Sequence, residues 1–203
     1  SMCIGYQCGT GATTELKNTA IGYQSMGFLG SGSDAYDNTA VGHRTLRWTS
    51  NGGYRNTAIG AGALQFSNAG WESTAIGASA LGTHQVSKHN TAVGSRAAYN
   101  SNDVNAIYNV MIGDYAAFTA SNTGKNNTII GSHAARLANN LGDYNVYIGT
   151  NSNNNATATG KGNVFIGNNT ATGATTNNDV ILLGYNAQPG AAVDHHMNLG
   201  DVI

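Results

Sequence analysis

The carboxylate side chains of this 203-residue sequence are the first candidates for chemistry, and their spacing argues against catalysis. The candidates are Asp34 with Asp37, Glu72, Asp103, Asp114 and Asp143. Cleavage of a glycosidic bond requires two carboxylates that face each other across the sugar. Acids in stretches of Gly, Asn and Ser that do not recur on one strand face are typical of solvated turns. We therefore do not predict a glycosidase.

Histidine is the other candidate for acid–base or metal chemistry. In an acyltransferase, one of His43, His84, His89 and His133 would serve as general base, but we interpret each as a solvated loop or corner residue. His195 and His196 are weak metal candidates, because three chains around an axis would supply several imidazoles to a transition metal. The alternative is a surface turn after Pro189. We predict no catalytic residue, no cofactor and no metal beyond these weak candidates.

The aromatic residues are the stronger indication of a ligand. They occur in polar stretches, where exposed rings suit stacking on sugar faces and short polar side chains suit sugar hydroxyls. Arg44, Arg47 and Arg55 would add contacts to an anionic sugar. We predict ligand binding within residues 27–71, by Tyr36, Arg47, Trp48, Tyr54, Arg55, Phe66 and Trp71. The alternative is that these residues pack beneath loops or at a seam between subunits.

A short repeat must position these residues. The pattern Asn-Thr-Ala-Ile/Val-Gly occupies residues 18–22, 38–42, 56–60 and 90–94, with Ser for Asn at 73–77. Altered copies occupy 109–113, 127–131, 145–149 and 163–167, and partial copies end at Gly5, Gly184 and Gly200. The glycines of successive copies recur at intervals of 16 to 20 positions. A regular period of this length indicates a solenoid of stacked coils.

The positions of the repeat predict places in the coil. The β-branched residue before glycine is expected to face inward, and the glycine to form a corner or a close backbone approach. Asn is expected to tolerate left-handed backbone and to stack in an amide ladder. The residue three places after glycine is always small, which predicts a tight interior.

Two further columns lead to expectations about packing. The residue four places after glycine changes from Met26, Leu46, Leu64 and Leu81 to mostly Ala, so packing is expected to thin towards the C-terminal half. The threonine column could present hydroxyls as an ice-binding solenoid does, but we favour internal hydrogen bonding or packing; its members are Thr19, Thr39, Thr57, Thr74, Thr91 and Thr128. The longest coil, from Gly22 to Gly42, is expected to project residues 27–37.

Composition sets the remaining limits. Charged residues are 9% of the chain, against about 25% in typical soluble proteins, and the net charge is −1. The nine scattered Lys and Arg residues indicate no nucleic-acid partner. We find no apolar run of about 18 residues that would span a membrane and no signal peptide. Cys3 and Cys8 do not form a framework of disulfides, and their redox state is left open.

These observations predict an all-β fold, a parallel β-solenoid or β-roll with about eleven coils of 16–20 residues. Residues 1–203 form a single repeat domain, with repeats from about 4 to 200. The buried aliphatic residues are too few to offset the entropy of ordering such a chain. We therefore expect a homotrimeric fibre in which neighbouring chains supply the missing burial.

The repeat resembles known fibre proteins. The units Asn18 to Met26 and Asn56 to Leu64 resemble repeats of phage tail fibres and similar virus surface fibres. Their Ala-Ile-Gly core is similar to that of trimeric autotransporter adhesin heads. The resemblance implies a left-handed parallel β-roll, a homotrimer, a location on a virion or extracellular surface, and attachment to a host-cell receptor such as a glycan.

The two ends of the chain extend this resemblance. Residues 197–203 resemble the segment that precedes the self-cleaving chaperone domain of many phage tail fibres. Ser1 and Met2 are interpreted as an expression scar. We therefore expect a piece of a longer fibre.

Two alternatives to a glycan-binding fibre stay open. One is a purely structural shaft without a ligand. The other is an acyltransferase, because Ile-Gly-Xaa-Xaa-small-Xaa also resembles the hexapeptide unit of left-handed β-helix acyltransferases. After Ile21 and Ile59 the next hexads would start at Gly27, Ser33, Gln65 and Trp71, none of which is the required aliphatic residue. One face in three fits, so we predict that the protein is not an enzyme.

Overall fold

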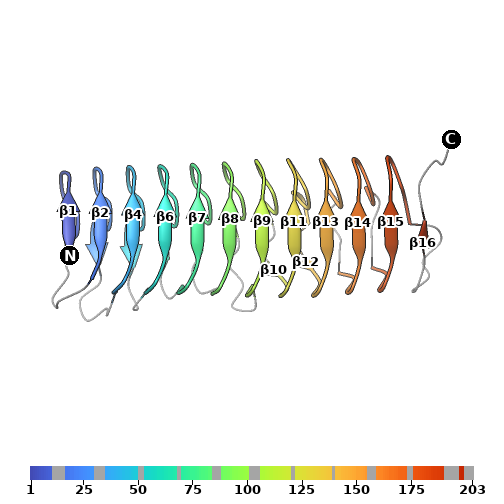
Figure 1. Cartoon of the computed structure of the whole chain (residues 1–203), viewed down its shortest axis with the longest axis horizontal. Helices are drawn as coiled ribbons and strands as arrows, with labels where there is room; N and C mark the ends of the chain where they lie inside the picture. Colours follow the sequence, from blue (N-terminus) through green and yellow to red (C-terminus); the bar gives the residue numbers. More distant parts are fainter. Residues whose placement is uncertain are drawn as a thin grey trace.

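The chain forms a rod of stacked coils that carries a single row of parallel strands (Figure 1). The computed structural model describes residues 1–10, 17–29, 35–49, 53–67, 70–83, 88–100, 106–119, 122–138, 140–154, 159–172, 176–189 and 197–198. The described residues contain strands and turns and no helix. The predicted all-β parallel solenoid is confirmed.

The main sheet has twelve strands, which follow one another in the order of the chain. They are β1 (Met2–Ile4), β2 (Thr19–Ile21), β4 (Thr39–Val41), β6 (Thr57–Ile59), β7 (Thr74–Ile76), β8 (Thr91–Val93), β9 (Val110–Ile112), β11 (Thr128–Ile130), β13 (Val146–Ile148), β14 (Val164–Ile166), β15 (Ile181–Leu183) and β16 (Met197–Asn198). Consecutive members are one turn of the solenoid apart. Equivalent residues pair, as in Thr19 with Thr39 and Ala20 with Ala40, so the sequence repeat is also the structural repeat.

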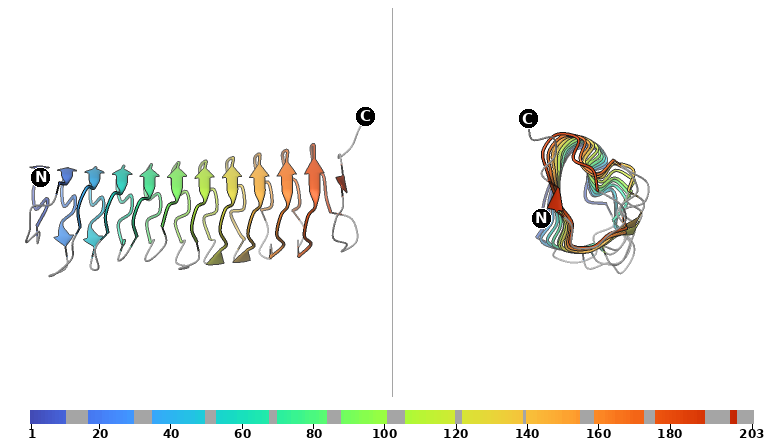
Figure 2. Two further views of the ribbon diagram at one scale, coloured as in Figure 1. Left: turned by 60° about the horizontal axis from the view of Figure 1, so that its bottom comes forward. Right: turned by 90° about the vertical axis from the view of Figure 1, so that its right-hand side faces the viewer.

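Two short sheets lie elsewhere on the coil. The strand β3 (Phe28–Leu29) pairs with β5 (Trp48–Thr49), and β10 (Asn122–Thr123) pairs with β12 (Asn140–Leu141). Viewed along the rod, the coils nearly superpose around a narrow interior (Figure 2). The start of the long coil is therefore part of the solenoid and does not project as expected, while its residues 30–34 lie outside the described residues.

The glycine that ends each strand forms a corner, as predicted. At Gly94 the backbone φ is 135°, and a Cβ atom there would lie 2.6 Å from the carbonyl carbon of Gly113 in the next coil. The corner glycines stack directly on one another along the rod, so any side chain would separate the coils.

The side chains of each three-residue strand have the reverse of the predicted inward and outward orientation. The middle residue is buried, whereas the aliphatic residue before glycine points outward: Ile59, Ile76, Ile112 and Ile166 are 36–39% exposed. Side chains alternate along a strand, so the residues on either side of the middle position share the outer face. The interior is narrow, and in five of the early coils Ala fills the middle position.

The core does not thin towards the C-terminal half. Instead, the large side chains move from one inward position of the coil to the other. In the early coils the middle strand residue is Ala, and the bulk comes from four places after glycine, as in Ala58 with Leu64. In later coils the middle residue is large and the other position is small, as in Ile129 with Ala135 and Phe165 with Ala171. Since interiors are close-packed, large residues on both sides would not fit.

The asparagines form a buried ladder, but one that bonds to backbone. The backbone N–H of Asn38 donates to Oδ1 of Asn18 at 2.8 Å, and Nδ2 of Asn38 donates to the carbonyl of Gly53 at 2.8 Å. The same pattern recurs down the rod. The expected stacking of Asn on Asn occurs, with one amide-to-amide hydrogen bond of 3.3 Å from Asn38 Nδ2 to Asn18 Oδ1, but most bonds of the ladder run from side chain to backbone and join one coil to the next.

Left-handed backbone occurs in the turns and not at these asparagines. It recurs two and four places after the corner glycine and just before the Asn position, as at Arg44, Leu46 and Arg55, with φ of 53°, 47° and 55°. These turns bend the chain sharply enough to close each coil. In the first coil, Cys3 and Cys8 form a disulfide with a Cα–Cα distance of 5.9 Å.

Candidate functional site

The predicted ligand-binding residues separate into two groups. The first, which we call the aromatic column, contains Tyr36, Tyr54, Trp71 and Lys88, each six places before a corner glycine. The rings of Tyr36 and Tyr54 are 4.9 Å apart and nearly parallel, and those of Tyr54 and Trp71 are 5.2 Å apart. Lys88 Nζ lies 3.5 Å from the centroid of the Trp71 ring. The solenoid thus converts aromatic residues 17 or 18 positions apart into one stack.

An ion-pair ladder runs beside the aromatic column. Arg55 Nη1 lies 2.9 Å from Glu72 Oε1, and His89 Nδ1 lies 3.0 Å from Glu72 Oε2. The hydrogen bond to Glu72 raises the pKa of Arg55 above its ordinary value. The His89 ring stacks on Tyr108 at 4.7 Å. Arg55, which was expected to contact an anionic sugar, is therefore already paired with a carboxylate.

The second group contains Phe28, Trp48, Phe66 and Arg47. The rings of Phe28 and Trp48 stack at 4.6 Å, and the guanidinium carbon of Arg47 lies 5.0 Å and 5.4 Å from their centroids. Trp48 and Phe66 are joined by a backbone bridge. The three aromatic residues are 38–41% exposed. This group lies at the short strands β3 and β5 and the bridge at Phe66, just before the variable stretches, whereas the aromatic column lies just after them.

Six of the seven predicted residues thus lie in these two groups and not in one cluster, and the seventh, Arg55, lies beside the aromatic column with its guanidinium carbon 5.8 Å from the Tyr54 ring centroid. Phe28 and Lys88 belong to the groups but were not among the seven. Tyr36, Tyr54 and Trp71 are half-buried against one another, while Trp48 and Phe66 are more exposed. Residues 50–52 and 68–69, between the two groups, lie outside the described residues. Ligand binding by these residues stays a prediction.

Five of the described acid–base candidates, His43, Glu72, His89, His133 and Asp143, are held in ring stacks or paired with a charged side chain, whereas Asp37 and Asp114 are exposed. The ring of His43 stacks on Tyr23 at 5.3 Å, and that of His133 stacks on Tyr115 at 5.5 Å. Within the described residues, no group of three or more His, Cys, Asp or Glu side chains is arranged to hold a metal ion. The remaining candidates, Asp34, His84, Asp103, His195 and His196, lie outside the described residues.

Asp143 is the carboxylate with a perturbed pKa. Partial burial raises the pKa of Asp143, but hydrogen bonds from the backbone N–H of Lys125 and from Lys161 outweigh it, so the pKa lies below its ordinary value. Lys161 Nζ is 3.1 Å from Asp143 Oδ2. A carboxylate held ionised in this way suits a structural ion pair better than a general acid.

The outward strand positions form a surface that the sequence analysis missed. This outer face consists of two columns, the first being Met2, Thr19, Thr39, Thr57, Thr74, Thr91, Val110, Thr128, Val146, Val164 and Ile181, and the second Ile4, Ile21, Val41, Ile59, Ile76, Val93, Ile112, Ile130, Ile148, Ile166 and Leu183. All are half-buried or exposed, and none is charged. The threonine hydroxyls form no hydrogen bond with other described residues, contrary to the internal role expected for them. The strand alternation of Thr and Ile was the signal that could have revealed this face.

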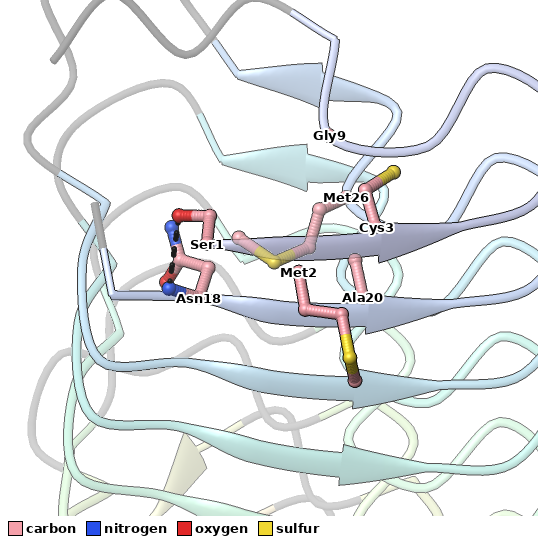
Figure 3. Close-up of a pocket in the computed structure, with 7 residues that line it drawn as sticks. All are labelled: Ser1, Met2, Cys3, Gly9, Asn18, Ala20 and Met26. Carbon is pink, nitrogen blue, oxygen red and sulfur yellow. Dashed lines mark hydrogen bonds between the residues drawn. The ribbon is translucent and has the colours of Figure 1, made fainter. Parts of the chain in front are cut away.

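A hollow opens at the first coil, lined by Ser1, Met2, Cys3, Gly9, Asn18, Ala20 and Met26 (Figure 3). In the first coil the two inward positions are occupied by Cys3 and Gly9, where the next coil has Ala20 and Met26. Two small residues in facing positions leave the space unfilled. The lining carries no charged side chain, so the hollow suggests no chemistry.

No protein-family model, curated protein or solved structure matches the chain. The described residues include no helix of the length and hydropathy needed to cross a lipid bilayer. The function must therefore be argued from the geometry of the surfaces described above.

Proposed function

We propose that the protein is a stiff segment of a trimeric, tail-fibre-like attachment protein on a virion or extracellular surface. The two aromatic groups described above would bind a cell-surface glycan. The observation that carries this proposal is the outer face, an uncharged double column that runs the length of a rod. A surface of this kind favours packing against other copies of the same chain.

The period of the outer face favours a copy of this chain as its partner. Its side chains recur at the strand spacing of about 4.8 Å, and only a surface with the same period can match it over the whole rod. Its extent is on the order of 50 Å by 10 Å, or about 500 Å², which approaches the roughly 800 Å² that each partner buries in a standard interface. Adjacent turn residues would supply the rest.

The two unlike columns favour a ring of chains. One column is aliphatic throughout, and the other is mainly threonine. Contact between one column and the other column of the next chain is heterologous, and such contacts close into rings. Three is the smallest number of chains in which each has two different neighbours, which agrees with the trimer implied by the resemblance to fibre proteins.

Sedimentation of the purified protein tests the assembly. We expect a trimer at micromolar concentration, and we expect Ile76→Glu combined with Ile112→Glu to give a monomer with an unchanged β-sheet circular dichroism spectrum. The matched control is Leu137→Glu, which changes an exposed apolar residue at the far end of the turn that follows β11 and should stay trimeric. A wild-type protein that sediments as a monomer would contradict the proposal.

The aromatic column supports the glycan part of the proposal. Its stacked rings cover one another's faces and present their edges beside Asn-, Ser- and Gly-rich stretches, and an aromatic edge can contact the apolar face of a sugar. On a glycan array we expect Trp71→Ala to reduce the signal at least tenfold. A reduced signal with Trp48→Ala would show that the second group binds the glycan as well. Tyr185→Ala, which removes an exposed ring elsewhere, is the control. Absence of any wild-type signal would indicate a purely structural shaft.

A second use of the outer face is suggested by its exposed threonines. Hydroxyl and methyl groups at regular spacing on a straight sheet are what an ice-binding solenoid presents. The two uses exclude each other, because assembly covers the face. A monomeric protein that produces thermal hysteresis in freezing solutions would favour ice binding, and a trimer without hysteresis would exclude it.

An acyltransferase receives no support from the geometry. A hexapeptide-repeat enzyme would have three equivalent faces in each coil, whereas the described coils share one long sheet and two short two-stranded sheets. Acetyl-CoA turnover by the purified protein remains the measurement that would revive this alternative.

A further inference from the structure

Four of the five arginines share one edge of the rod, the turn that follows the corner glycine. They are Arg44, Arg47, Arg96 and Arg136, at the second or fifth place of that turn. None of these four is paired with a carboxylate of a described residue, whereas Arg55, on the other edge, is paired with Glu72. Positive charge is therefore concentrated on this edge, although the chain as a whole has a net charge of −1.

Two of these arginines converge on one ring. Arg96 follows β8, Tyr115 follows β9 and Arg136 follows β11, so the three residues lie on consecutive coils (Figure 1). The guanidinium carbons of Arg96 and Arg136 lie 5.2 Å and 5.3 Å from the centroid of the Tyr115 ring. The two cationic groups therefore share one aromatic neighbour. Arg96 Nη1 also donates a hydrogen bond to Tyr115 Oη.

The guanidinium of Arg136 has donors without acceptors. Its Nε is buried and has no hydrogen-bond partner, and its other nitrogens bond to no described residue. The Nε of Arg47, at the equivalent place of an earlier coil, is buried and unpartnered as well. Buried donors are normally satisfied, so each of these two N–H groups calls for an explanation such as an ordered water or an anion. Both arginines are also fixed over aromatic rings, which reduces the entropy lost when a ligand binds.

The neighbouring charges favour an anion. The described residues around Tyr115 add His133, whose ring stacks on that of Tyr115, and one acid, the exposed Asp114. Arginine guanidinium groups bind carboxylates and sulfates through two parallel hydrogen bonds. Because Arg96 and Arg136 lie two coils apart, about 10 Å at the strand spacing, they suit two neighbouring anionic substituents of one chain, one on each guanidinium.

We propose that Arg96 and Arg136, ordered by Tyr115, form a binding site for the carboxylate or sulfate groups of an acidic carbohydrate. That the anion is carried by a sugar rests on the glycan-binding function proposed above. The anion site itself stands on the arginine geometry. It is separate from the aromatic column, which lies on the other edge of the coil and in earlier repeats.

Calorimetric titration of the full chain tests this site with three probes: a heparin tetrasaccharide, a short polysialic acid and neutral dextran. We expect binding of at least one acidic probe and none of dextran. Arg96→Gln with Arg136→Gln should weaken that binding at least tenfold. Arg136→Lys, which keeps the charge and loses the planar fork, should weaken it about threefold or more.

The matched control is Lys125→Gln with Lys161→Gln, which removes the same charge elsewhere on the rod and should change the affinity less than twofold. Equal losses in the two double variants, equal binding of dextran, or no binding of either acidic probe would each overturn the proposal. Sedimentation and circular dichroism of every variant report whether the fold is intact. Because Trp71→Ala leaves Arg96 and Arg136 in place, failure of the aromatic column as a glycan site is distinguishable from failure of the anion site.

Discussion

At the scale of the residue, the corner glycines have the least tolerance for change. Two effects combine at the corners from Gly5 to Gly167: a φ between 126° and 140° that only glycine adopts readily, and a carbonyl of the next coil that lies closer than van der Waals contact to any added Cβ. By contrast, the left-handed turn positions accept Arg, Leu, Glu and Tyr. Their backbone is strained but leaves room for a side chain.

We predict that Gly94→Ala lowers the free energy of unfolding by more than about 3 kcal/mol, the combined effect of backbone strain and displacement of a coil. Urea denaturation followed by circular dichroism measures this loss. The control is Gly62→Ser, which places at φ 67° the residue that the next coil carries as Ser79. It should cost about 1 kcal/mol or less. Similar losses in both variants would show that φ, and not the close approach of the coils, explains the glycine column.

At the scale of the element, most coils fill their interior from one of two sides, while the coil of β8 has Ala at both positions, Ala92 and Ala98. Ala58 with Leu64 and Ile129 with Ala135 are the two solutions. This alternation between coils explains why neither the middle strand position nor the position four places after glycine is large throughout the rod. The buried Asn ladder is independent of this choice, because it bonds to backbone groups present in every coil.

We predict that Leu64→Ala lowers the free energy of unfolding by about 3 kcal/mol, the usual cost of such a cavity. Adding Ala58→Ile recreates the later type of coil and should recover more than half of that loss. Ala58→Ile alone should destabilise the protein by about 1–3 kcal/mol through overpacking. A double-mutant cycle measures the coupling. Additive effects would mean that the two positions do not share one space.

At the scale of the whole molecule, the rod is one-dimensional, because each coil pairs with the coil before it and the coil after it. Stability in such proteins is close to a sum over repeats and their contacts. The rod should therefore tolerate removal of a complete repeat but not removal of part of one.

We predict that deletion of residues 78–94, the stretch from one corner glycine to the next, leaves a folded rod whose far-ultraviolet spectrum per residue is unchanged. A deletion of residues 78–86 shifts the register between inward and outward positions and should abolish cooperative unfolding. Thermal unfolding of the two variants distinguishes these outcomes. A folded half-repeat deletion would contradict the view that register fixes the coil.

The solenoid, its period and the glycine corners can be predicted from the amino-acid sequence alone. These follow from repetition, because any residue that returns every 16 to 20 positions must lie over its copies in a parallel rod. The position of Trp71 over Tyr54 is an example.

The folded solenoid was needed to establish which face of each strand is inside. Alternation places Thr74 and Ile76 on the same face and Ala75 on the other, but it does not say which of these faces the core. The width of the coil decides, since the interior already holds Ala80 and Leu81 from the following turn and has room for Ala75 alone. The aliphatic residues are therefore displaced to the surface, where they are available to a partner.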